Sequence, residues 1–445
     1  MIPPLQREAP VASAESTPQW SLAARIGFRF AFSYFILYLG PGAVGALGIR
    51  DRIIHTPYRD VWVAFWHNVV PWVGANVLHL KGDFREIPNG SGDELYDYIL
   101  VFCIVILALA STAIWSWLDR KRPNYERMHA WLRLLMRLSV VAPMVGYGVN
   151  KLFRAQFAEP PLVRYIDPLG QASPMGLLWT FMGLSRAYSI FGGIGEVAAG
   201  LLVLVPRFVT LGSLLMIGVM SNVLMLNMGY DVPRKIYSIH LILIGVFLLL
   251  PDVRRLLNMF ILNRPVDPAR EAPLFKNKRW NFGALIFQLG YGLLALITAS
   301  HQARLDEVKA ATHLPPVWRG VWAVDDFVLD NVSHPPLETD KERWRYVVFD
   351  TPDLLSIQYM DESLQQYYQR LDQEQNTLKF SVLGRTDWKA TLSLDRSQPD
   401  RITMTGGVDG RPLTVRLRKL DMSDPNKFLL INRGFHWVNQ VPFRR

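Results

Sequence analysis

Long runs of apolar residues dominate the first 300 positions of the chain. Each run approaches or exceeds the roughly 17–25 residues that a helix needs to cross a bilayer. The predicted spans are Leu22–Leu47, Tyr98–Trp117, Trp131–Phe153, Ala187–Val205, Phe208–Met228, Ile236–Leu250 and Trp280–Ser300. The shortest, Ile236–Leu250, is long enough only if its helix begins near Pro233 and continues to Pro251. The pattern therefore predicts an α-helical transmembrane bundle of about seven spans.

Beyond residue 315 apolar and polar positions alternate, which is the period of a half-buried β-strand. Strands are expected at Trp344–Phe349, Leu354–Tyr359, Leu378–Val382, Trp388–Leu394, Arg401–Thr405 and Leu413–Leu417. Turn residues such as Gly406-Gly407 and Asp409-Gly410 separate them. This region has room for about eight strands and is expected to form a small extracytoplasmic β-barrel or sandwich. A barrel of that size is able to hold one small ligand.

The two patterns divide the chain into domains. We expect a mobile N-terminus at 1–19, a transmembrane domain at 20–304, a linker at 305–316 and the β domain at 317–445. Within the second domain, Tyr58–Leu80 is apolar but interrupted by polar residues and by Pro71, which is typical of an interfacial or partly re-entrant helix. His67 and His79 are about three turns apart there and are interpreted as solvated histidines, with no metal assigned.

Charge gives the expected topology. The chain of 445 residues carries a formal net charge of +10, and its basic residues gather in the loops at 120–137 and 254–279. Loops of this kind stay on the cytoplasmic side of a membrane. The sequence therefore predicts a multi-pass plasma-membrane protein with a cytoplasmic N-terminus and an extracytoplasmic β domain. Nucleic acid is excluded as a partner because the bases flank membrane spans and do not line one face of a soluble domain.

Redox motifs are scarce in the sequence. Cys103 stands alone, which excludes an intramolecular disulfide and a cysteine-ligated cluster. There is also no GxGxxG motif after a strand and no CxxCH motif. These features argue against a dehydrogenase that carries its own electron carrier. They favour either a subunit that works with an electron-transfer partner protein or a chemistry that involves only a quinol.

Charged and polar side chains inside the apolar segments are the main candidates for function, because a charge at membrane depth is usually paired, faces a cavity or is functional. Candidate proton-exchanging residues are Lys151, Glu196 and His240. Candidate ligand-binding residues are Asn222, Asn227, Tyr230, Asp231, Lys235 and Gln156. Most of them are expected to converge in the outer half of the bundle, as small-molecule sites do.

Each candidate also has a structural interpretation. Lys151 is able to snorkel to the interface, and Glu196 to hold helices together as a neutral or paired carboxylate. Asn222 and Asn227 suit hydrogen bonds between helices, Asp231 and Lys235 suit a loop ion pair, and His240 suits a satisfied buried histidine. The sequence leaves these alternatives open.

Three segments resemble a known family. The runs "GYGVNKLFRAQF", "SPMGLLWTFMGLSRAYSIFGGIGEVAAGLLVL" and "NVLMLNMGYDVPRKIYSIHL", with the tail "INRGFHWVNQVPF", look like the DoxX family of integral membrane proteins in a larger form with a C-terminal β domain. The family's name derives from a subunit of a thiosulfate:quinone oxidoreductase. The resemblance implies a helical bundle with characteristic positions at Lys151, Glu196, Asn227, Asp231, Lys235 and His240.

The order of bundle and β domain is also distantly similar to vitamin K-dependent carboxylases, in which a membrane lysine acts as a base on a quinol. We treat this similarity as one of architecture only.

Two functions follow as hypotheses. The first is a quinone-linked membrane oxidoreductase or a subunit of one, in which Lys151 or His240 exchanges a proton with a quinone headgroup and Glu196 relays it. The second is a non-catalytic membrane protein whose β domain binds a lipid-like ligand or a protein partner. A quinone is the cofactor that the first hypothesis implies, and no metal is expected.

Overall fold

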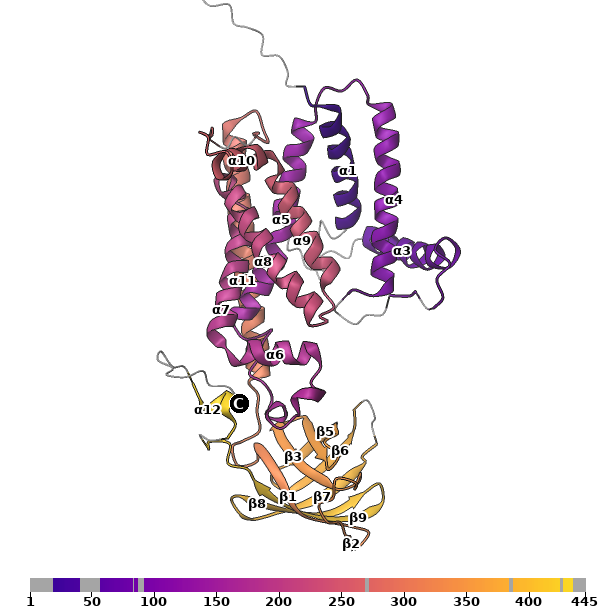
Figure 1. Ribbon diagram of the computed structural model, residues 1–445, viewed down its shortest axis with the longest axis vertical. Coiled ribbons are helices and arrows are strands. Elements are labelled where there is room, and N and C mark those ends of the chain that lie inside the picture. The colour runs from indigo at the N-terminus through magenta and orange to yellow at the C-terminus, as the bar shows by residue number, and fades with distance from the viewer. Residues whose placement is uncertain are drawn as a thin grey trace, which may run out of the picture. The chain divides into compact units, whose positions relative to one another are not determined.

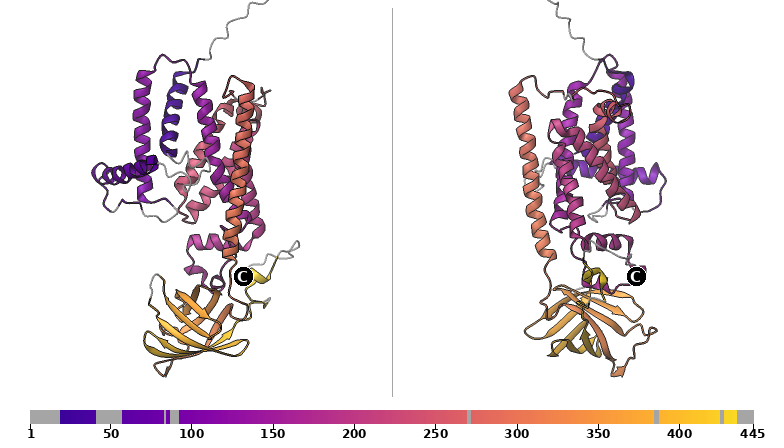
Figure 2. Two further views of the ribbon diagram at one scale, coloured as in Figure 1. Left: turned by 180° about the vertical axis from the view of Figure 1, so that it is seen from behind. Right: turned by 60° about the vertical axis from the view of Figure 1, so that its left-hand side comes forward.

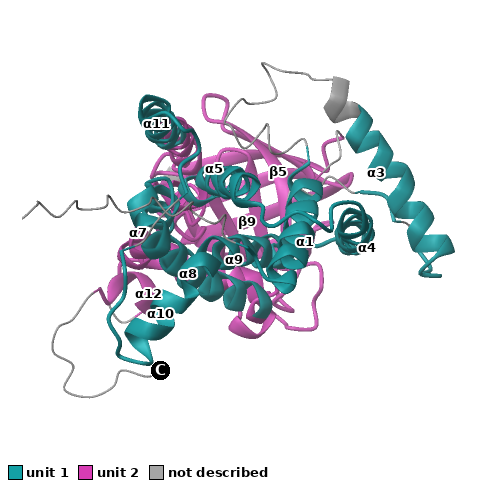
Figure 3. Cartoon of the chain, turned by 90° about the horizontal axis from the view of Figure 1, so that it is seen from above, with its two compact units in different colours: residues 1–145, 196–228, 232–296 teal, residues 146–195, 229–231, 297–445 magenta. Residues whose placement is uncertain are grey.

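The computed structural model describes residues 19–40, 57–82, 84–86, 92–268, 272–383, 387–424 and 427–434. The expected mobile start at 1–19 lies almost entirely outside these residues. So do residues 41–47 of the first expected span and most of the tail motif that begins at Ile431. The chain divides into two compact units, shown in Figure 3. Unit 1 comprises Met1–Val145, Glu196–Met228 and Val232–Leu296, and unit 2 comprises Gly146–Gly195, Gly229–Asp231 and Ile297–Arg445.

Up to residue 310, the regular elements of the described chain are all helical (Figure 1). They are α1 (Leu22–Leu39), α3 (Pro57–Asn76), α4 (Leu95–Leu118), α5 (Glu126–Leu152), α6 (Pro174–Leu184), α7 (Arg186–Leu202), α8 (Val209–Gly229), α9 (Lys235–Leu249), α10 (Val253–Phe260) and α11 (Lys278–Ala310). Short 3₁₀ turns are η1 (Leu162–Tyr165), η2 (Leu169–Gln171), η3 (Pro206–Phe208) and η4 (Leu250–Asp252).

Six helices among the described residues are long and apolar enough to cross a membrane. They are Leu22–Leu39, Leu95–Leu118, Glu126–Leu152, Pro206–Gly229, Lys235–Phe260 and Lys278–Ala310. Such a set is compatible with a multi-pass membrane protein. The expected span Ala187–Val205 forms α7, whose 17 residues are at the lower limit for crossing a membrane. The expected helical bundle of about seven spans is confirmed, with six of the expected spans in clearly long and apolar helices.

Helix α3 differs from the spans in direction. It runs across the end of α4 that carries Leu95, and not alongside α4 (Figures 1 and 2). Trp66 and Val70 are buried, whereas Phe65 and Trp72 are exposed. One buried and one exposed apolar face is the arrangement expected of an interfacial helix.

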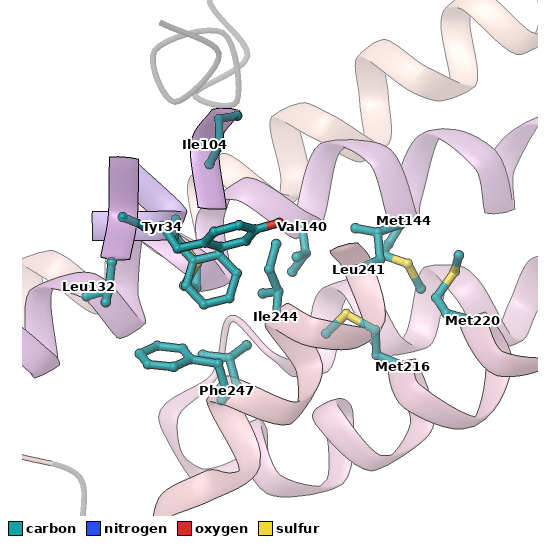
Figure 4. Packing of buried hydrophobic residues seen from close by; sticks show 14 of the residues in the cluster. Tyr34, Ile104, Leu132, Val140, Met144, Met216, Met220, Leu241, Ile244 and Phe247 are labelled. Carbon is teal, nitrogen blue, oxygen red and sulfur yellow. The ribbon is translucent and has the colours of Figure 1, made fainter. Parts of the chain in front are cut away.

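The core of unit 1 joins helices that are distant in sequence. Met144 of α5, Met216 and Met220 of α8 and Leu241 of α9 pack together in one buried cluster (Figure 4). A close approach of helices contributes to this packing, since a Cβ added at Gly200 would lie 2.9 Å from the Cβ of Met144. Small residues allow this kind of contact between helices.

The strands of unit 2 close into an antiparallel barrel. They are β1 (Gly320–Leu329), β2 (Val332–Ser333), β3 (Trp344–Thr351), β4 (Leu354–Tyr359), β5 (Leu364–Asp372), β6 (Thr377–Val382), β7 (Ala390–Gln398), β8 (Arg401–Val408) and β9 (Arg411–Lys419). Eight of them, all except β2, pair in sequence order, and β1 pairs with β9 to close the ring. The expected β domain is confirmed, and of the two expected architectures it is the barrel.

Large apolar side chains fill the barrel. Trp322, Phe349 and Leu392 are fully buried, and Phe327 and Phe380 are almost so. The alternation that the sequence shows at Leu413–Leu417 places every second residue of β9 in this core. An interior occupied by side chains is the usual state of a small barrel of eight strands.

A loop of unit 2 packs on the outside of this barrel. Val163 of η1 contacts a small apolar cluster with Val321 and Val348. The backbone N–H of Leu162 donates to Asp350 Oδ2 at 2.8 Å, and Arg319 Nε donates to Asp350 Oδ1 at 2.9 Å. The chain between α5 and α6 is thereby fixed to the barrel wall.

Helix α11 continues to Ala310, so the first half of the segment expected as a linker at 305–316 is helical. Two local expectations are corrected. Gly406-Gly407 lies inside β8 and is not a turn, although Asp409 and Gly410 form one, with φ of 51° and 77°. Trp388 precedes β7 and is 40% exposed, so it does not belong to the alternating strand.

Candidate functional site

His240 lies in a buried cluster of aromatic side chains in unit 1. Its Nε2 is 2.6 Å from the hydroxyl of Tyr34, and its Nδ1 is 2.7 Å from the backbone carbonyl of Ile236. The imidazole stacks on the ring of Tyr38, with centroids 3.7 Å apart and planes at 4°. His240 itself is only 4% exposed.

These contacts assign the protons. A carbonyl oxygen only accepts, so Nδ1 of His240 carries the hydrogen that points to Ile236. In the neutral imidazole Nε2 is then the acceptor, and the Tyr34 hydroxyl donates to it. A hydroxyl thus donates a hydrogen bond to an imidazole inside an apolar bundle, which is an arrangement suited to proton exchange.

Sequence reasoning found His240 but missed its partners. Tyr34 and Tyr38 are one helical turn apart in α1, and their rings stack with an interplanar angle of 1°. The available signal was two tyrosines at a spacing of four within an apolar span, because buried tyrosine hydroxyls usually have a polar partner. The pairing itself joins positions 206 residues apart.

Lys151 lies in the last turn of α5, within unit 2, and is 7% exposed. Its Nζ lies 6.0 Å from the centroid of the Tyr147 ring and 5.9 Å from that of Phe157, which is within range for cation–π attraction. Helix α7 passes close by, since a Cβ added at Gly193 would lie 3.0 Å from the Cβ of Lys151. The side chain is enclosed by protein groups, unlike a lysine that snorkels along a lipid-facing surface.

Glu196 is a buried carboxyl group of unit 1. It lies in α7 and is 2% exposed. An ionised carboxylate without compensation at such a position would cost several kcal/mol, so the group is either compensated or protonated. A compensated carboxylate and a protonated carboxyl group are each compatible with a proton relay and with a structural role. Both interpretations of Glu196 therefore stay open.

The start of α9 is held by a residue that the sequence reasoning did not single out. The carboxylate of Asp93 accepts from the backbone N–H of Lys235 at 2.5 Å and from that of Ile236 at 2.9 Å. The Nζ of Lys235 is 4.0 Å from the same carboxylate. A carboxylate at a helix N-terminus satisfies free N–H groups and interacts favourably with the helix dipole.

The two candidate asparagines of α8 differ in their surroundings. Asn227 fixes the corner between α8 and α9, because its Nδ2 donates to Ser238 Oγ at 2.9 Å and to the carbonyl of Arg234 at 3.3 Å. This geometry agrees with the structural interpretation of Asn227. Asn222 is exposed on α8.

Three candidates besides Lys151 belong to unit 2. Tyr230 is partly buried, and Asp231 is exposed with a φ of 51°. Gln156 has a buried Oε1 without a hydrogen-bond partner among the described residues. The candidates are therefore distributed over both units: His240, Lys235, Asn227 and Glu196 belong to unit 1, and Lys151 and Gln156 to unit 2. Among the described residues, no three His, Cys, Asp or Glu side chains group as a metal site requires.

Comparison with known proteins finds similarity to an uncharacterized bacterial protein. No protein-family model matches the chain, and no solved structure matches it. The chain is 30% identical over 134 residues to the uncharacterized protein YwoB of Bacillus subtilis strain 168, and the match covers 29% of this chain and 82% of that protein. The chain therefore belongs to the same family as YwoB.

Proposed function

We propose that the protein is a quinone-linked membrane protein, a subunit of an oxidoreductase, in which Tyr34 and His240 exchange protons with a quinone headgroup. The buried hydrogen bond of 2.6 Å between these two side chains is the observation that carries the proposal. Oxidation of a quinol releases two protons and two electrons. The imidazole accepts one proton, and the second passes to water. Both electrons pass to a partner protein, because the sequence has no motif for an electron carrier of its own.

We also propose that Lys151 and Glu196 take part in proton transfer. Both side chains are buried, and a buried ionisable residue in an apolar helix is usually paired or functional. If the two groups are coupled, the double variant Lys151→Met with Glu196→Gln loses less stability than the sum of the single variants.

The proposed topology places the N-terminus and both basic loops in the cytoplasm and the barrel outside. One cavity supports the placement of both basic loops on the same side of the membrane. Glu126 at the start of α5, Pro206 before α8 and Asn281 near the start of α11 all line this cavity. Helix α5 leads away from this side and α8 begins on it again, so the chain has to return between them, where α7 lies. We infer that α7 crosses despite its length. A reporter fusion at Arg445 that signals from the cytoplasm would contradict this topology.

Analysis of the molecules that co-purify in mild detergent tests the function. The expected result is a quinone at close to one per chain in the wild type, and much less in Tyr34→Phe. Tyr188→Phe is the matched control, because Tyr188 is an exposed tyrosine of α7. Absence of any quinone from freshly extracted protein, or equal amounts in all three proteins, would refute the proposal.

The outer surface of the barrel favours a second candidate function, the binding of a protein partner. Tyr368 and Trp388 stack at 6.1 Å, and both are exposed. Exposed aromatic pairs are common at protein interfaces. The filled barrel interior means that a lipid-like ligand of this domain would also have to bind outside. Cross-linking from position 388 that captures only lipid would argue against a protein partner.

A further inference from the structure

Unit 1 contains a cavity of about 950 Å³ that the sequence did not predict. Its lining comes from the ends of helices: Glu126 begins α5, Pro206 precedes α8, Pro251 follows α9, and Asn281 lies in the first turn of α11. The cavity therefore lies at the end of the bundle that carries the two basic loops, which is the level of lipid headgroups. Its volume lies within the usual range for small-molecule sites.

Charge in this cavity changes with depth. Arg133 and Arg137 lie about 10 and 16 Å below the start of α5, at 1.5 Å per residue, and both are buried. Their guanidinium groups donate to the carbonyls that end two helices: Arg133 to Leu248, and Arg137 to Val203 and Leu204. The deep part of the lining is thus rich in guanidinium groups.

The outer part of the lining carries acids. Glu126 and Asp267 line the cavity and are exposed. A third carboxylate, Asp252, is buried, but it accepts from Arg255 Nη1 and Thr210 Oγ1, each at 2.5 Å. The cavity is consequently cationic inside and anionic at its exposed residues.

One polar atom in the wall of the cavity lacks a hydrogen-bond partner among the described residues. Gln288 of α11 lines the cavity and is 2% exposed, and its Nε2 donates to the carbonyl of Ala284 at 2.9 Å. Its Oε1 has no hydrogen-bond partner among the described residues. A buried acceptor without a partner is destabilising, so a bound molecule, or a water that it brings, would complete the hydrogen bonding of the wall.

We propose that this cavity binds the headgroup of phosphatidylethanolamine. In a lipid whose chains lie in the membrane, the phosphate is deeper than the amine, and this order matches guanidinium groups inside and carboxylates outside. Arginine is well suited to phosphate, and an ammonium group supplies the N–H donors that Glu126 and Asp267 accept. The apolar part of the lining, from Leu134, Val209 and Leu285, receives the start of the acyl chains. The proposal is independent of quinone binding.

Native mass spectrometry of delipidated protein tests the proposal, with phosphatidylethanolamine, phosphatidylcholine and phosphatidylglycerol added in competition. Choline has no N–H donor, and phosphatidylglycerol has no ammonium group. We expect phosphatidylethanolamine to be retained about tenfold more than either, which corresponds to about 1.4 kcal/mol. Equal retention of the three lipids would overturn the proposal.

Two variants separate the cavity from general lipid binding. Ala284→Trp places a large side chain in the cavity and should abolish the selective retention, whereas Ile286→Trp on the same turn points to an exposed position and should preserve it. Exchange of both outer acids, Glu126→Gln with Asp267→Asn, should reduce the preference over phosphatidylglycerol about threefold. Selective retention in Ala284→Trp would overturn the proposal. An equal thermal shift from inorganic phosphate would show a free-anion site and overturn the lipid assignment.

Discussion

The barrel and the helical unit bury their polar side chains differently. The interior of the barrel is mostly apolar, and a hydrogen bond of 2.8 Å joins Tyr359 and Tyr367. The barrel domain also buries Arg343, which donates to the carbonyl of Val324 at 3.2 Å. Unit 1 buries ionisable groups deep among its helices, including Arg29, Glu196 and His240. The barrel therefore depends on apolar burial that each strand encodes locally, whereas the helical unit depends on partners that come from distant segments.

The largest expected effect tests the barrel side of this comparison. Phe349→Ala removes a fully buried ring and should destabilise the barrel by about 4 kcal/mol. Leu354→Ala on the neighbouring strand is the control, because Leu354 is partly exposed, and it should cost less than about 1 kcal/mol. Pulse proteolysis in urea on the full-length protein measures both values. Similar losses for the two variants would mean that the barrel interior is not the main source of its stability.

A buried arginine tests the helical side. Arg29 donates to Tyr125 Oη at 2.9 Å, to Ser116 Oγ at 2.8 Å and to the carbonyl of Asp119 at 2.9 Å. Arg29→Ala leaves these acceptors without a donor, and the expected loss is about 3 kcal/mol.

Arg25 lies one turn away on α1 and is the matched control for Arg29. It donates to the carbonyls of Arg120 and Arg122 in exposed positions, so Arg25→Ala should cost about 1 kcal/mol or less. Thermal unfolding in detergent ranks the two variants. If Arg25→Ala were the more damaging change, polar burial would not distinguish the helical unit.

The difference between local and long-range interactions also explains which strands of the barrel are predictable from the sequence. Alternation at Leu413–Leu417 and Leu378–Val382 located β9 and β6, because strand periodicity is a local property. β1 and β5 were not identified; both place charged or amide side chains between their apolar ones, as Asp325-Asp326 shows in β1. Closure of the barrel depends on the pairing of β1 with β9, about 90 residues apart, which periodicity does not encode.

The site was less predictable for the same reason. His240 and Glu196 were identified because a polar residue stands out in an apolar span. The partners of His240 and Lys235 are not predictable in this way. Tyr34 contacts His240, and Asp93 contacts Lys235, from distant parts of the chain. The cavity near the basic loops is likewise not predictable from the sequence, because it forms only where the ends of several helices meet.

A smaller effect concerns the pH dependence of the barrel. Burial alone would raise the pKa of Asp340, but hydrogen bonds with His334 and from the backbone N–H groups of Glu342 and Arg343 lower it below the ordinary 3.8. The carboxylate therefore stabilises the folded barrel above about pH 4, and this contribution is lost as the pH falls through the folded-state pKa.

Asp340→Asn should cost about 1 kcal/mol at pH 7 and flatten the loss of stability below about pH 4. Urea denaturation of the full-length protein at several pH values measures this. Asp361→Asn is the comparison variant. Hydrogen bonds donated by Ser363 also lower the pKa of Asp361, but its carboxylate is fully exposed, so its contribution to stability should be smaller. An unchanged pH profile in Asp340→Asn would show that the interaction with His334 contributes nothing.

Binding of a short-chain quinone analogue to the detergent-purified protein tests the central claim most directly. The account predicts saturable binding at one site per chain, weakened about tenfold in Tyr34→Phe because His240 loses its hydroxyl partner, and unchanged in Tyr188→Phe. Binding that does not saturate, or that is equally strong in Tyr34→Phe and the wild type, would contradict a quinone site at Tyr34 and His240.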